Sequence, residues 1–330
     1  MQSSAQTGGH SLGVFSVIES ELAQVRVFIE RDLSDCSELV RGLVVCANAG
    51  QGKMIRPGLV LLSGLACGGL TENHIKAASI FEMIHNVSLL HDDVVDEGKS
   101  RRGVSTLNGI YGNEPAVLFG DFLLGRVMQM CVGLDKRVAE IIALSAMQTC
   151  EGELRQISQR GNWSLSEAEY IEIISGKTAA LFEGACATGA VLAGAEESTV
   201  QALAAYGRNF GIAFQITDDL LDLVGEQDKT GKPAGNDLDR DKLTLPLIHL
   251  LKTANETEKQ KVKLILSRQN GNDGRMELVE KLNSFGSIEY ARRRAEEFVE
   301  QAITAMAGIG NNRGSKSLVE TARFIVGRTA

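Results

Sequence analysis

Apolar residues recur at spacings of three and four along most of the chain, the periodicity of helices with one buried face. The segment Ile75–Leu90 is an example, with Ile80, Ile84 and Val87 on one broad face. Alternating strand patterns are scarce, and only four prolines occur in 330 residues. Because a proline inside a helix costs about 3 kcal/mol, this scarcity favours long uninterrupted helices. The pattern predicts an all-α fold.

Polar segments that contain glycine interrupt the predicted helices. Gly98–Gly103 ends one helix, Gly225–Asp241 follows another, and Asn270–Gly274 and Gly308–Gly314 are predicted as surface turns. None of these segments has the length and composition of a domain linker. We therefore expect a single domain over residues 1–330, built as a bundle of long helices.

Composition and charge exclude several classes of protein. The net charge is −8, and no basic stripe that would bind nucleic acid is present. None of the six cysteines forms a C-x-x-C pair, which favours reduced, buried thiols. Residues 1–14 lack the pattern of a secretory signal, and no apolar run reaches the roughly 20 residues that span a bilayer. We expect a soluble cytoplasmic protein.

Two Asp-Asp-x-x-Asp motifs, each at the end of an apolar stretch, carry the candidate chemistry. Residues four apart on an α-helix differ by about 40° around its axis, so the first and last aspartates of each motif share a face. Such neighbouring carboxylates repel each other unless a cation lies between them, and hard oxygen ligands suit Mg²⁺. A single motif of this kind is equally well explained as a solvated helix end without a metal. Two such motifs favour a site that binds a diphosphate through metal ions. The candidate metal ligands are Asp92, Asp93, Asp96, Asp218, Asp219 and Asp222.

Basic residues beside glycines or aspartates supply candidate partners for diphosphate oxygens. Taken singly, each is most simply an ordinary surface charge. Gly176-Lys177-Thr178 is not a phosphate-binding loop of the Walker type, since position 171 is Ile and the stretch is predicted as helix. The basic candidates are Lys53, Arg56, Arg101, Arg102, Lys177, Lys232 and Lys242.

Two polar residues lie on the same predicted helices as the aspartates. His85 precedes Asp92 by seven residues, or two turns, and Gln215 precedes Asp219 by four. Each is either a polar residue satisfied inside the helix bundle or a ligand of the substrate, and the spacing favours the second interpretation for His85.

Six motifs in order resemble the trans-isoprenyl diphosphate synthase (polyprenyl synthetase) family, most closely its long-chain, octaprenyl-type branch. The resemblance runs from about Gly52 to Pro246, and the one visible departure is Gln51 where the family often has glycine. The motifs are Gly-Lys-Met-Ile-Arg-Pro, His-Asp-Asp-Val-Val-Asp with Arg-Arg-Gly, Gly-Lys-Thr-Ala-Ala-Leu-Phe, Phe-Gln-Ile-Thr-Asp-Asp-Leu-Leu-Asp, Gly-Lys-Pro-Ala-Gly-Asn-Asp-Leu and Lys-Leu-Thr-Leu-Pro-Leu.

The resemblance implies helices around a deep central cavity, usually in a homodimer, and about three Mg²⁺ ions with bound diphosphate. Asp92, Asp96 and Asp218 would be the main ligands, with Asp93, Asp219 and Asp222 assisting. The allylic diphosphate would be held by Arg101, Lys177, Lys232 and Lys242. Isopentenyl diphosphate would be held by Lys53, Arg56, His85 and Arg102. Thr178 and Gln215 would point oxygens at the developing allylic cation, and Phe214 would line its pocket.

The implied reaction is ionisation of the allylic diphosphate, condensation with isopentenyl diphosphate, and loss of a proton. Class I terpene cyclases share the fold but usually replace the second motif with an Asn/Asp…Ser/Thr…Glu pattern. A non-catalytic subunit of a heteromeric synthase would be expected to lose aspartates or basic residues, and this chain keeps them.

Product length depends on side chains one turn below the first motif. Val87 and Ser88 lie five and four residues before Asp92, and neither is large enough to block a growing chain. Bulkier candidates for a floor are Phe119, Phe122, Leu123 and Met128. We expect a product longer than C20, released with transient membrane contact, with a farnesyl or geranylgeranyl diphosphate synthase as the alternative.

Overall fold

The computed structural model describes residues 13–48, 52–101, 103–224, 242–267 and 271–327. Within these ranges the chain is almost entirely helical, and the strands are a single two-stranded antiparallel pair. The predicted all-α fold is confirmed. No helix in the described ranges combines the length and the apolar character needed to cross a membrane.

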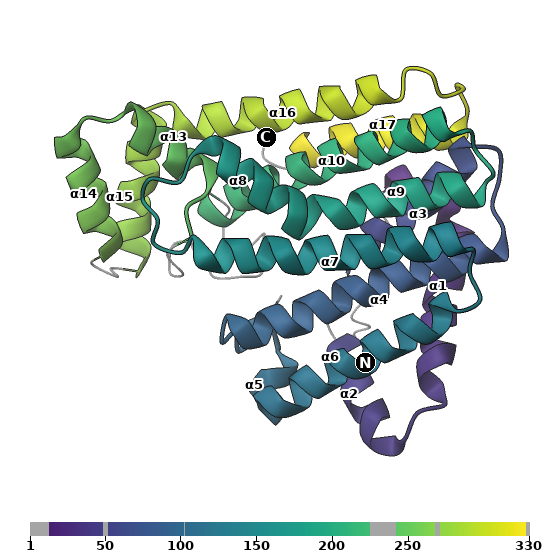
Figure 1. Cartoon of the computed structure of the whole chain (residues 1–330). Helices are drawn as coiled ribbons and strands as arrows, with labels where there is room; N and C mark the ends of the chain where they lie inside the picture. The colour runs from purple at the N-terminus through teal and green to yellow at the C-terminus, as the bar shows by residue number, and fades with distance from the viewer. Residues whose placement is uncertain (1–12, 49–51, 102, 225–241, 268–270, 328–330) are drawn as a thin grey trace, which may run out of the picture. The chain divides into compact units, whose positions relative to one another are not determined.

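The chain divides into two compact units, and Figure 1 labels their α-helices. Unit 1 takes in the chain through Asp135, with Thr188–Ala195 and Gly310–Thr321, and unit 2 takes in the remainder. Unit 1 contains the 3₁₀-helix η1 (Gly13–Ile18), α1 (Glu19–Ser34), α2 (Glu38–Asn48), α3 (Ile55–Ala66), α4 (Glu72–Val95), β1 (Ser100–Arg101), β2 (Val104–Ser105), α5 (Leu107–Tyr111) and α6 (Asn113–Cys131).

Unit 2 contains most of the remaining helices. These are α7 (Lys136–Ser158), α8 (Glu167–Ile174), the π-helix η2 (Ser175–Ala179), α10 (Glu197–Val224), α13 (Leu245–Thr253), α14 (Glu256–Ser267), α15 (Gly271–Ser284) and α16 (Ser287–Ala305). The helices α9 (Ala180–Leu192) and α17 (Arg313–Val326) contribute residues to both units. The single-domain assignment of residues 1–330 stays a prediction.

Unit 1 is organised around α4, which packs against α1, α3 and α6. Figure 1 shows α4 and α6 running side by side. The face of α4 predicted from its periodicity is buried, including Ile80, which has no exposed surface, and the stretch 77–84 is buried on every side. Burying a side chain of this size stabilises the fold by about 1.5–3 kcal/mol. Because α4 is held along its length, its C-terminal end is a defined platform for the first aspartate motif.

Unit 2 is organised around α10, whose main neighbours are α16 and η2. Gly207 and Gly211, one turn apart, let Phe182 and Ala179 approach the backbone of α10. A Cβ atom at Gly207 would lie 2.4 Å from the carbonyl oxygen of Phe182, and one at Gly211 would lie 2.5 Å from the Cα atom of Ala179. Side chains other than hydrogen are therefore excluded at both positions, and η2 packs closely on the helix that carries the second motif.

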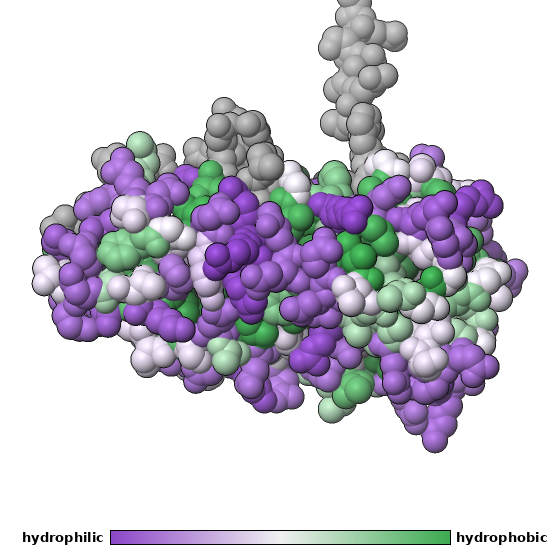
Figure 2. Space-filling model, turned by 90° about the horizontal axis from the view of Figure 1, so that it is seen from above, coloured by the Kyte–Doolittle hydropathy of each residue, from purple (hydrophilic) through white to green (hydrophobic). Residues whose placement is uncertain are grey.

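One predicted turn needs correction. The sequence predicts a turn at Asn270–Gly274, but α15 begins at Gly271. The predicted turn at Gly308–Gly314 is non-helical as far as Asn312, and α17 begins at Arg313. Polar residues and glycine suit the first turn of a helix, where the N–H groups have no partner within the helix. The predicted break at Gly98–Gly103 is confirmed and contains β1, whereas Gly225–Asp241 lies outside the described residues. Hydrophilic residues cover most of the face drawn in Figure 2, with hydrophobic ones showing between them.

Candidate functional site

The first aspartate motif lies at the C-terminal end of α4 in unit 1. Asp92 and Asp93 belong to the last turn, and Asp96 is the residue that caps the helix. The N–H of Asp96 donates to the carbonyl oxygen of Asp92 over 2.8 Å, so the helical spacing continues through the motif. This bond supports the predicted common face of Asp92 and Asp96, both of which are half-buried.

Asp93, the middle residue of this motif, is paired with Arg101. Nη2 of Arg101 donates to Oδ1 of Asp93 over 2.7 Å, and Nε donates to the same oxygen over 3.0 Å. The pair is part-buried, with 29% of the arginine side chain and 14% of the aspartate side chain exposed. Such forked pairs of guanidinium and carboxylate fix direction as well as distance.

A short hairpin brings Arg101 back to α4. Arg101 of β1 pairs with Val104 of β2, and Gly103 adopts φ +76°, a conformation that glycine reaches without strain. Asn108 donates from Nδ2 to the carbonyl oxygen of Asp93 over 2.9 Å, which fixes the backbone at the same point. Arg102, predicted to bind isopentenyl diphosphate, lies outside the described residues.

Lys53 and Arg56 flank the N-terminus of α3. Lys53 is exposed and Arg56 is half-buried, while Met54 between them is the N-cap in a left-handed conformation with φ +53°. Free N–H groups and the helix dipole make such a terminus favourable for anions. The two predicted basic residues therefore lie where helix geometry also favours a phosphate.

The second motif lies in the last two turns of α10 in unit 2. Asp218 is exposed and Asp222 is half-buried, but Asp219 is only 2% exposed. One residue corresponds to about 100° around a helix, so Asp219 faces the protein when Asp218 faces outward. The middle aspartates of both motifs thus lie against protein partners, whereas the family resemblance implied that Asp93 and Asp219 would assist in holding the metal.

The carboxylate of Asp219 accepts bonds from three donors within the described part of the chain. Oδ2 accepts from the hydroxyl of Tyr170 over 2.8 Å, and Oδ1 accepts from Nε2 of Gln215 over 2.8 Å. Lys242 lies with Nζ 3.2 Å from Oδ1, and its side chain is largely buried. These bonds bring together three of the predicted residues, Gln215, Asp219 and Lys242.

Lys177 and Thr178 are carried by η2, a single π-helical turn. Thr178 donates its hydroxyl proton to Oε1 of Gln215 over 2.6 Å, and Nζ of Lys177 lies 2.5 Å from Oε2 of Glu153 on α7. A Cβ atom at Gly152 would lie 2.0 Å from the backbone nitrogen of Lys177, so α7 and η2 touch through glycine. Such π-turns inside helices occur frequently at functional sites.

Aromatic side chains surround Phe214, which is half-buried. The centroid of its ring lies 5.3 Å from that of Phe182 and 6.4 Å from that of Phe210. Lys232, the remaining basic candidate in this part of the chain, lies outside the described residues.

The product-length candidates lie on α4 and α6 of unit 1. Val87 is 7% exposed and Phe119 is 3% exposed, and Phe119 stacks on Phe122 with 6.4 Å between the ring centroids. Ser88 donates its hydroxyl proton to the carbonyl oxygen of His85 over 2.8 Å. Met128 is 62% exposed, which argues against its use as a floor inside a buried cavity.

Two residues of these networks were missed by sequence reasoning. Tyr170 and Glu153 are not members of any motif, and a tyrosine in an apolar helix is most simply explained as core. Their partners Asp219 and Lys177 are 49 and 24 residues away along the chain, so no local spacing indicates the contacts.

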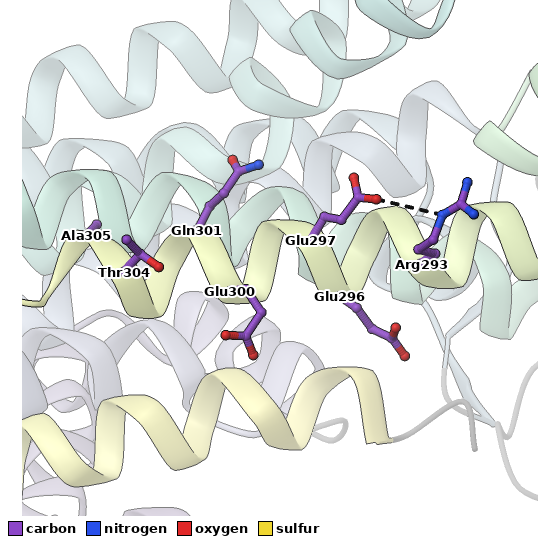
Figure 3. A pocket seen from close by; sticks show the side chains of 7 residues that line it. All are labelled: Arg293, Glu296, Glu297, Glu300, Gln301, Thr304 and Ala305. Atoms are coloured by element: carbon purple, nitrogen blue, oxygen red, sulfur yellow. Dashed lines mark ion pairs between the residues drawn. The ribbon is translucent and has the colours of Figure 1, made fainter.

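The surface hollows found among the described residues do not by themselves indicate where the functional site lies. Figure 3 shows one along α16, where Arg293 and Glu297 pair and where none of the predicted residues lies. A second, of about 20 Å³, lies beside Tyr170 and Lys242 and is large enough for about one water molecule.

The carboxylates suit a metal that brings most of its own ligands. Among the described residues, no group of three or more histidine, cysteine, aspartate or glutamate side chains forms a metal site. Each motif instead presents two carboxylates, its first and last, that are not buried. Oxygen donors in this number suit Mg²⁺, which keeps several waters and binds substrate phosphates.

Comparison with known proteins places this arrangement in context. A family model described as Polyprenyl synthetase matches residues 38–282. Octaprenyl diphosphate synthase of Escherichia coli (strain K12) is 35% identical over 309 residues, covering 93% of this chain and 96% of its own.

Two solved structures are similar over nearly the whole chain. Polyprenyl synthase of Caulobacter crescentus CB15, complexed with calcium and isoprenyl diphosphate, has a TM-score of 0.90 and 32% identity, covering 96% of this chain and 97% of its own. Geranylgeranyl pyrophosphate synthetase of Pyrococcus horikoshii Ot3 has a TM-score of 0.88 and 34% identity, covering 95% and 98%.

Proposed function

This chain belongs to the polyprenyl synthetase family and is an all-trans prenyltransferase that acts on isoprenyl diphosphates, and we propose that it makes a product longer than C20. The reaction is the head-to-tail condensation of isopentenyl diphosphate with an allylic diphosphate. The observation that best supports the proposed residue roles is the bonded series Thr178–Gln215–Asp219–Lys242, which joins four predicted site residues in unit 2.

A divalent metal is part of the family's catalysis, and we propose that the metal is Mg²⁺, with about three ions bound beside the diphosphate. Asp92, Asp96 and Asp218 would be the main ligands, and Asp222 would assist. When bound, the ions would neutralise charge on the diphosphate. Asp93 and Asp219, expected from the sequence to assist the metal, are better suited to hold Arg101 and Lys242 because their carboxylates already accept bonds from these cations.

The basic residues divide between the two substrates. Arg101, Lys177, Lys232 and Lys242 would hold the allylic diphosphate, and Lys53, Arg56, His85 and Arg102 would hold isopentenyl diphosphate. The first group is supported by the pairing of three of its members with carboxylates that fix their directions. Lys53 and Arg56 in the second group are supported by their place at the N-terminus of α3.

Ionisation begins the reaction. The bond between C1 and oxygen of the allylic diphosphate breaks, and both electrons leave with the diphosphate, whose charge the basic residues stabilise. Thr178 lies beside the developing cation and faces it with hydroxyl lone pairs, because its proton is donated to Gln215. Phe214, within its aromatic cluster, would line the cation pocket.

Condensation and elimination complete the cycle. The C3=C4 double bond of isopentenyl diphosphate attacks C1 of the cation, forming a bond between C4 and C1. A proton then leaves C2, the new double bond forms between C2 and C3, and the departed diphosphate accepts the proton. No side-chain nucleophile is required.

Product length is the finer part of the proposal. Val87 and Ser88 are small, and they lie on α4 just before the first motif, so they would let the chain grow past them. Phe119 on the neighbouring α6 would act as the floor. Relatives include octaprenyl and geranylgeranyl synthases, so family membership leaves the length open.

Assembly and location are also proposals. Leu118, Met128 and Val132 are exposed apolar side chains on or directly after α6, which supports a homodimer. A cytoplasmic location would give access to the charged diphosphate substrates, and a long apolar product would need transient contact with a membrane for release.

Product analysis of the isolated chain tests the proposed function. The purified protein is incubated with Mg²⁺, labelled isopentenyl diphosphate and, in separate reactions, dimethylallyl, geranyl and farnesyl diphosphate, and dephosphorylated products are separated by chromatography. We expect products longer than C20. Turnover by this chain alone also excludes a non-catalytic subunit, whereas a product of C15 or C20 would overturn the proposed length.

A further inference from the structure

Tyr170 lies outside every motif, yet it contacts the most buried carboxylate of the second motif. Its side chain is 2% exposed, and its hydroxyl donates to Oδ2 of Asp219 over 2.8 Å. Tyr170 belongs to α8, so the contact joins the helix before η2 to α10. It lies two turns before Lys177 along the same helical run.

The bonds beyond Asp219 have a fixed direction. An ionised carboxylate only accepts hydrogen bonds, so the amide of Gln215 must turn its NH₂ group toward Oδ1 of Asp219. The amide oxygen then faces Thr178, whose hydroxyl has to donate to it. The single hydroxyl proton of Thr178 is therefore used in the bond to Gln215. Only the lone pairs of the hydroxyl oxygen remain to face a substrate.

Reversal of the donor and acceptor roles of Gln215 and Thr178 would slow ionisation of the allylic diphosphate. If Asp219 rotated away, the Gln215 amide would be free to turn over and present its NH₂ group to Thr178. The threonine oxygen would then accept from Gln215, and its proton would be free to point at the developing cation. A positive hydrogen facing a carbocation raises the energy of the ionised state.

We propose that Tyr170 is a positioning residue: its hydroxyl holds Asp219, so that Gln215 accepts from Thr178 and the oxygen of Thr178 stays an acceptor toward the allylic cation. This inference rests on the proposed function, because it assumes that the cation forms beside Thr178. Tyr170 itself touches no substrate. Its main effect is therefore expected on the rate of ionisation, because Tyr170 bonds Oδ2 of Asp219 whereas Lys242 pairs with Oδ1 and keeps that ion pair.

The test compares Tyr170→Phe with a matched control. Tyr290 on α16 donates its hydroxyl to Oε2 of Glu167, the first residue of α8, over 2.5 Å, so Tyr290→Phe removes the same kind of bond from the start of the helix that carries Tyr170. We expect Tyr170→Phe to lower kcat about 10- to 100-fold while the KM for each diphosphate stays within about threefold. Tyr290→Phe is expected to keep the wild-type kcat.

A double-mutant cycle separates positioning from general loss of structure. Because Tyr170 acts through Thr178, the variant Tyr170→Phe/Thr178→Val should be no slower than Thr178→Val alone. A fully additive loss, a wild-type kcat for Tyr170→Phe, or an equal loss in Tyr290→Phe would overturn the proposal.

A rescue variant covers the case in which Tyr170→Phe does not fold. Tyr170→4-aminophenylalanine keeps an N–H donor at the same place, and we expect it to restore at least about a third of the wild-type kcat. A folded rescue variant as slow as Thr178→Val would contradict the proposal. Absence of prenyl transfer by the wild type would instead overturn the proposed function, so the two failures are distinguishable.

Discussion

Asp93 and Arg101 form a forked ion pair that ties the hairpin after α4 to the helix itself, with Nη2 of the arginine 2.7 Å from Oδ1 of the aspartate. An arginine has five N–H donors, so pairing along one edge of the guanidinium leaves donors for a second anion. The pair therefore fixes the direction of Arg101 and leaves N–H donors for the allylic diphosphate that we propose it binds.

Asp93→Asn should weaken binding of the allylic diphosphate more than it changes the need for metal. We expect the KM for that substrate to rise about tenfold, which corresponds to about 1.4 kcal/mol, with an unchanged Mg²⁺ concentration for half-maximal rate. Steady-state kinetics over both concentrations measure the two effects. Asp121→Asn on α6, where the carboxylate is exposed, is the control. A shift in the Mg²⁺ requirement alone would instead assign Asp93 to the metal.

Removal of metal should abolish turnover. In excess EDTA we expect no product, with recovery on adding Mg²⁺ or Mn²⁺. Asp92→Ala and Asp218→Ala should each lower kcat by orders of magnitude, since loss of an electrostatic partner of the transition state costs on the order of 3 kcal/mol or more. Calorimetric titration with Mg²⁺ and inorganic diphosphate checks binding apart from activity. Full turnover in EDTA would contradict the metal mechanism.

Local pattern predicted the helices well and predicted contacts across the chain poorly. The apolar face of Ile75–Leu90 is buried as expected because it follows from spacing along one helix. The burial of Asp219 follows from the packing of α8 against α10. The motif alone does not predict which of its three aspartates is buried. Gln215 has hydrogen-bond partners on both sides, Thr178 and Asp219. These contacts agree with both interpretations of Gln215, as a satisfied polar residue and as a residue of the site.

Val87→Phe should shorten the product. A ring in place of an isopropyl group on the buried face of α4 would block chain growth near the first motif, while the first condensation should keep most of its rate. Chromatography of dephosphorylated products measures the change. Val27→Phe on α1 places the same ring at an exposed position and should leave the product unchanged. Identical products from wild type and Val87→Phe would show that this part of α4 does not line the growing chain.

Gly152→Ala should disturb η2. The added methyl group would lie 2.0 Å from the backbone nitrogen of Lys177, and neither backbone yields easily. We expect a loss of about 1–3 kcal/mol in the free energy of unfolding, as in other overpacked sites, and a reduced kcat. Gly125→Ala has no neighbouring atom within 4 Å and should be neutral or slightly stabilising. Denaturant unfolding and steady-state kinetics test both, and equal stability of the two variants would contradict the contact.

His74 should make stability depend on pH. Its Nε2–H donates to the carbonyl oxygen of Gly189 over 3.1 Å, while Nδ1 accepts from the N–H of Thr71 over 3.0 Å, so the neutral ring fits and the charged ring does not. Burial lowers the pKa of His74 below its ordinary value of 6.5. The unfolded chain therefore binds a proton first as pH falls, and the stability contributed by His74 is present above pH 6.5 and is lost as pH falls through the lowered pKa.

His74→Asn should remove this dependence. At neutral pH we expect the variant to be less stable by about 1–3 kcal/mol because buried partners lose their bonds. The difference from wild type should shrink as the medium becomes acidic. Denaturant unfolding at a series of pH values measures it, and a difference that does not vary with pH would argue that the ring is not neutral in the folded protein.

The π-turn of η2 contains one residue more than an α-helical turn would need. Deletion of a single residue there would restore a regular helix between α8 and α9 and leave the two helices nearly in phase, because the wide turn absorbs the extra residue, but it would move the residues inside the turn around the helix axis. Lys177 and Thr178 could then no longer meet Glu153 and Gln215 together. A gene that loses this one codon would therefore still encode a helical protein of nearly the same sequence, but one whose proposed site residues Lys177 and Thr178 are out of phase with their partners.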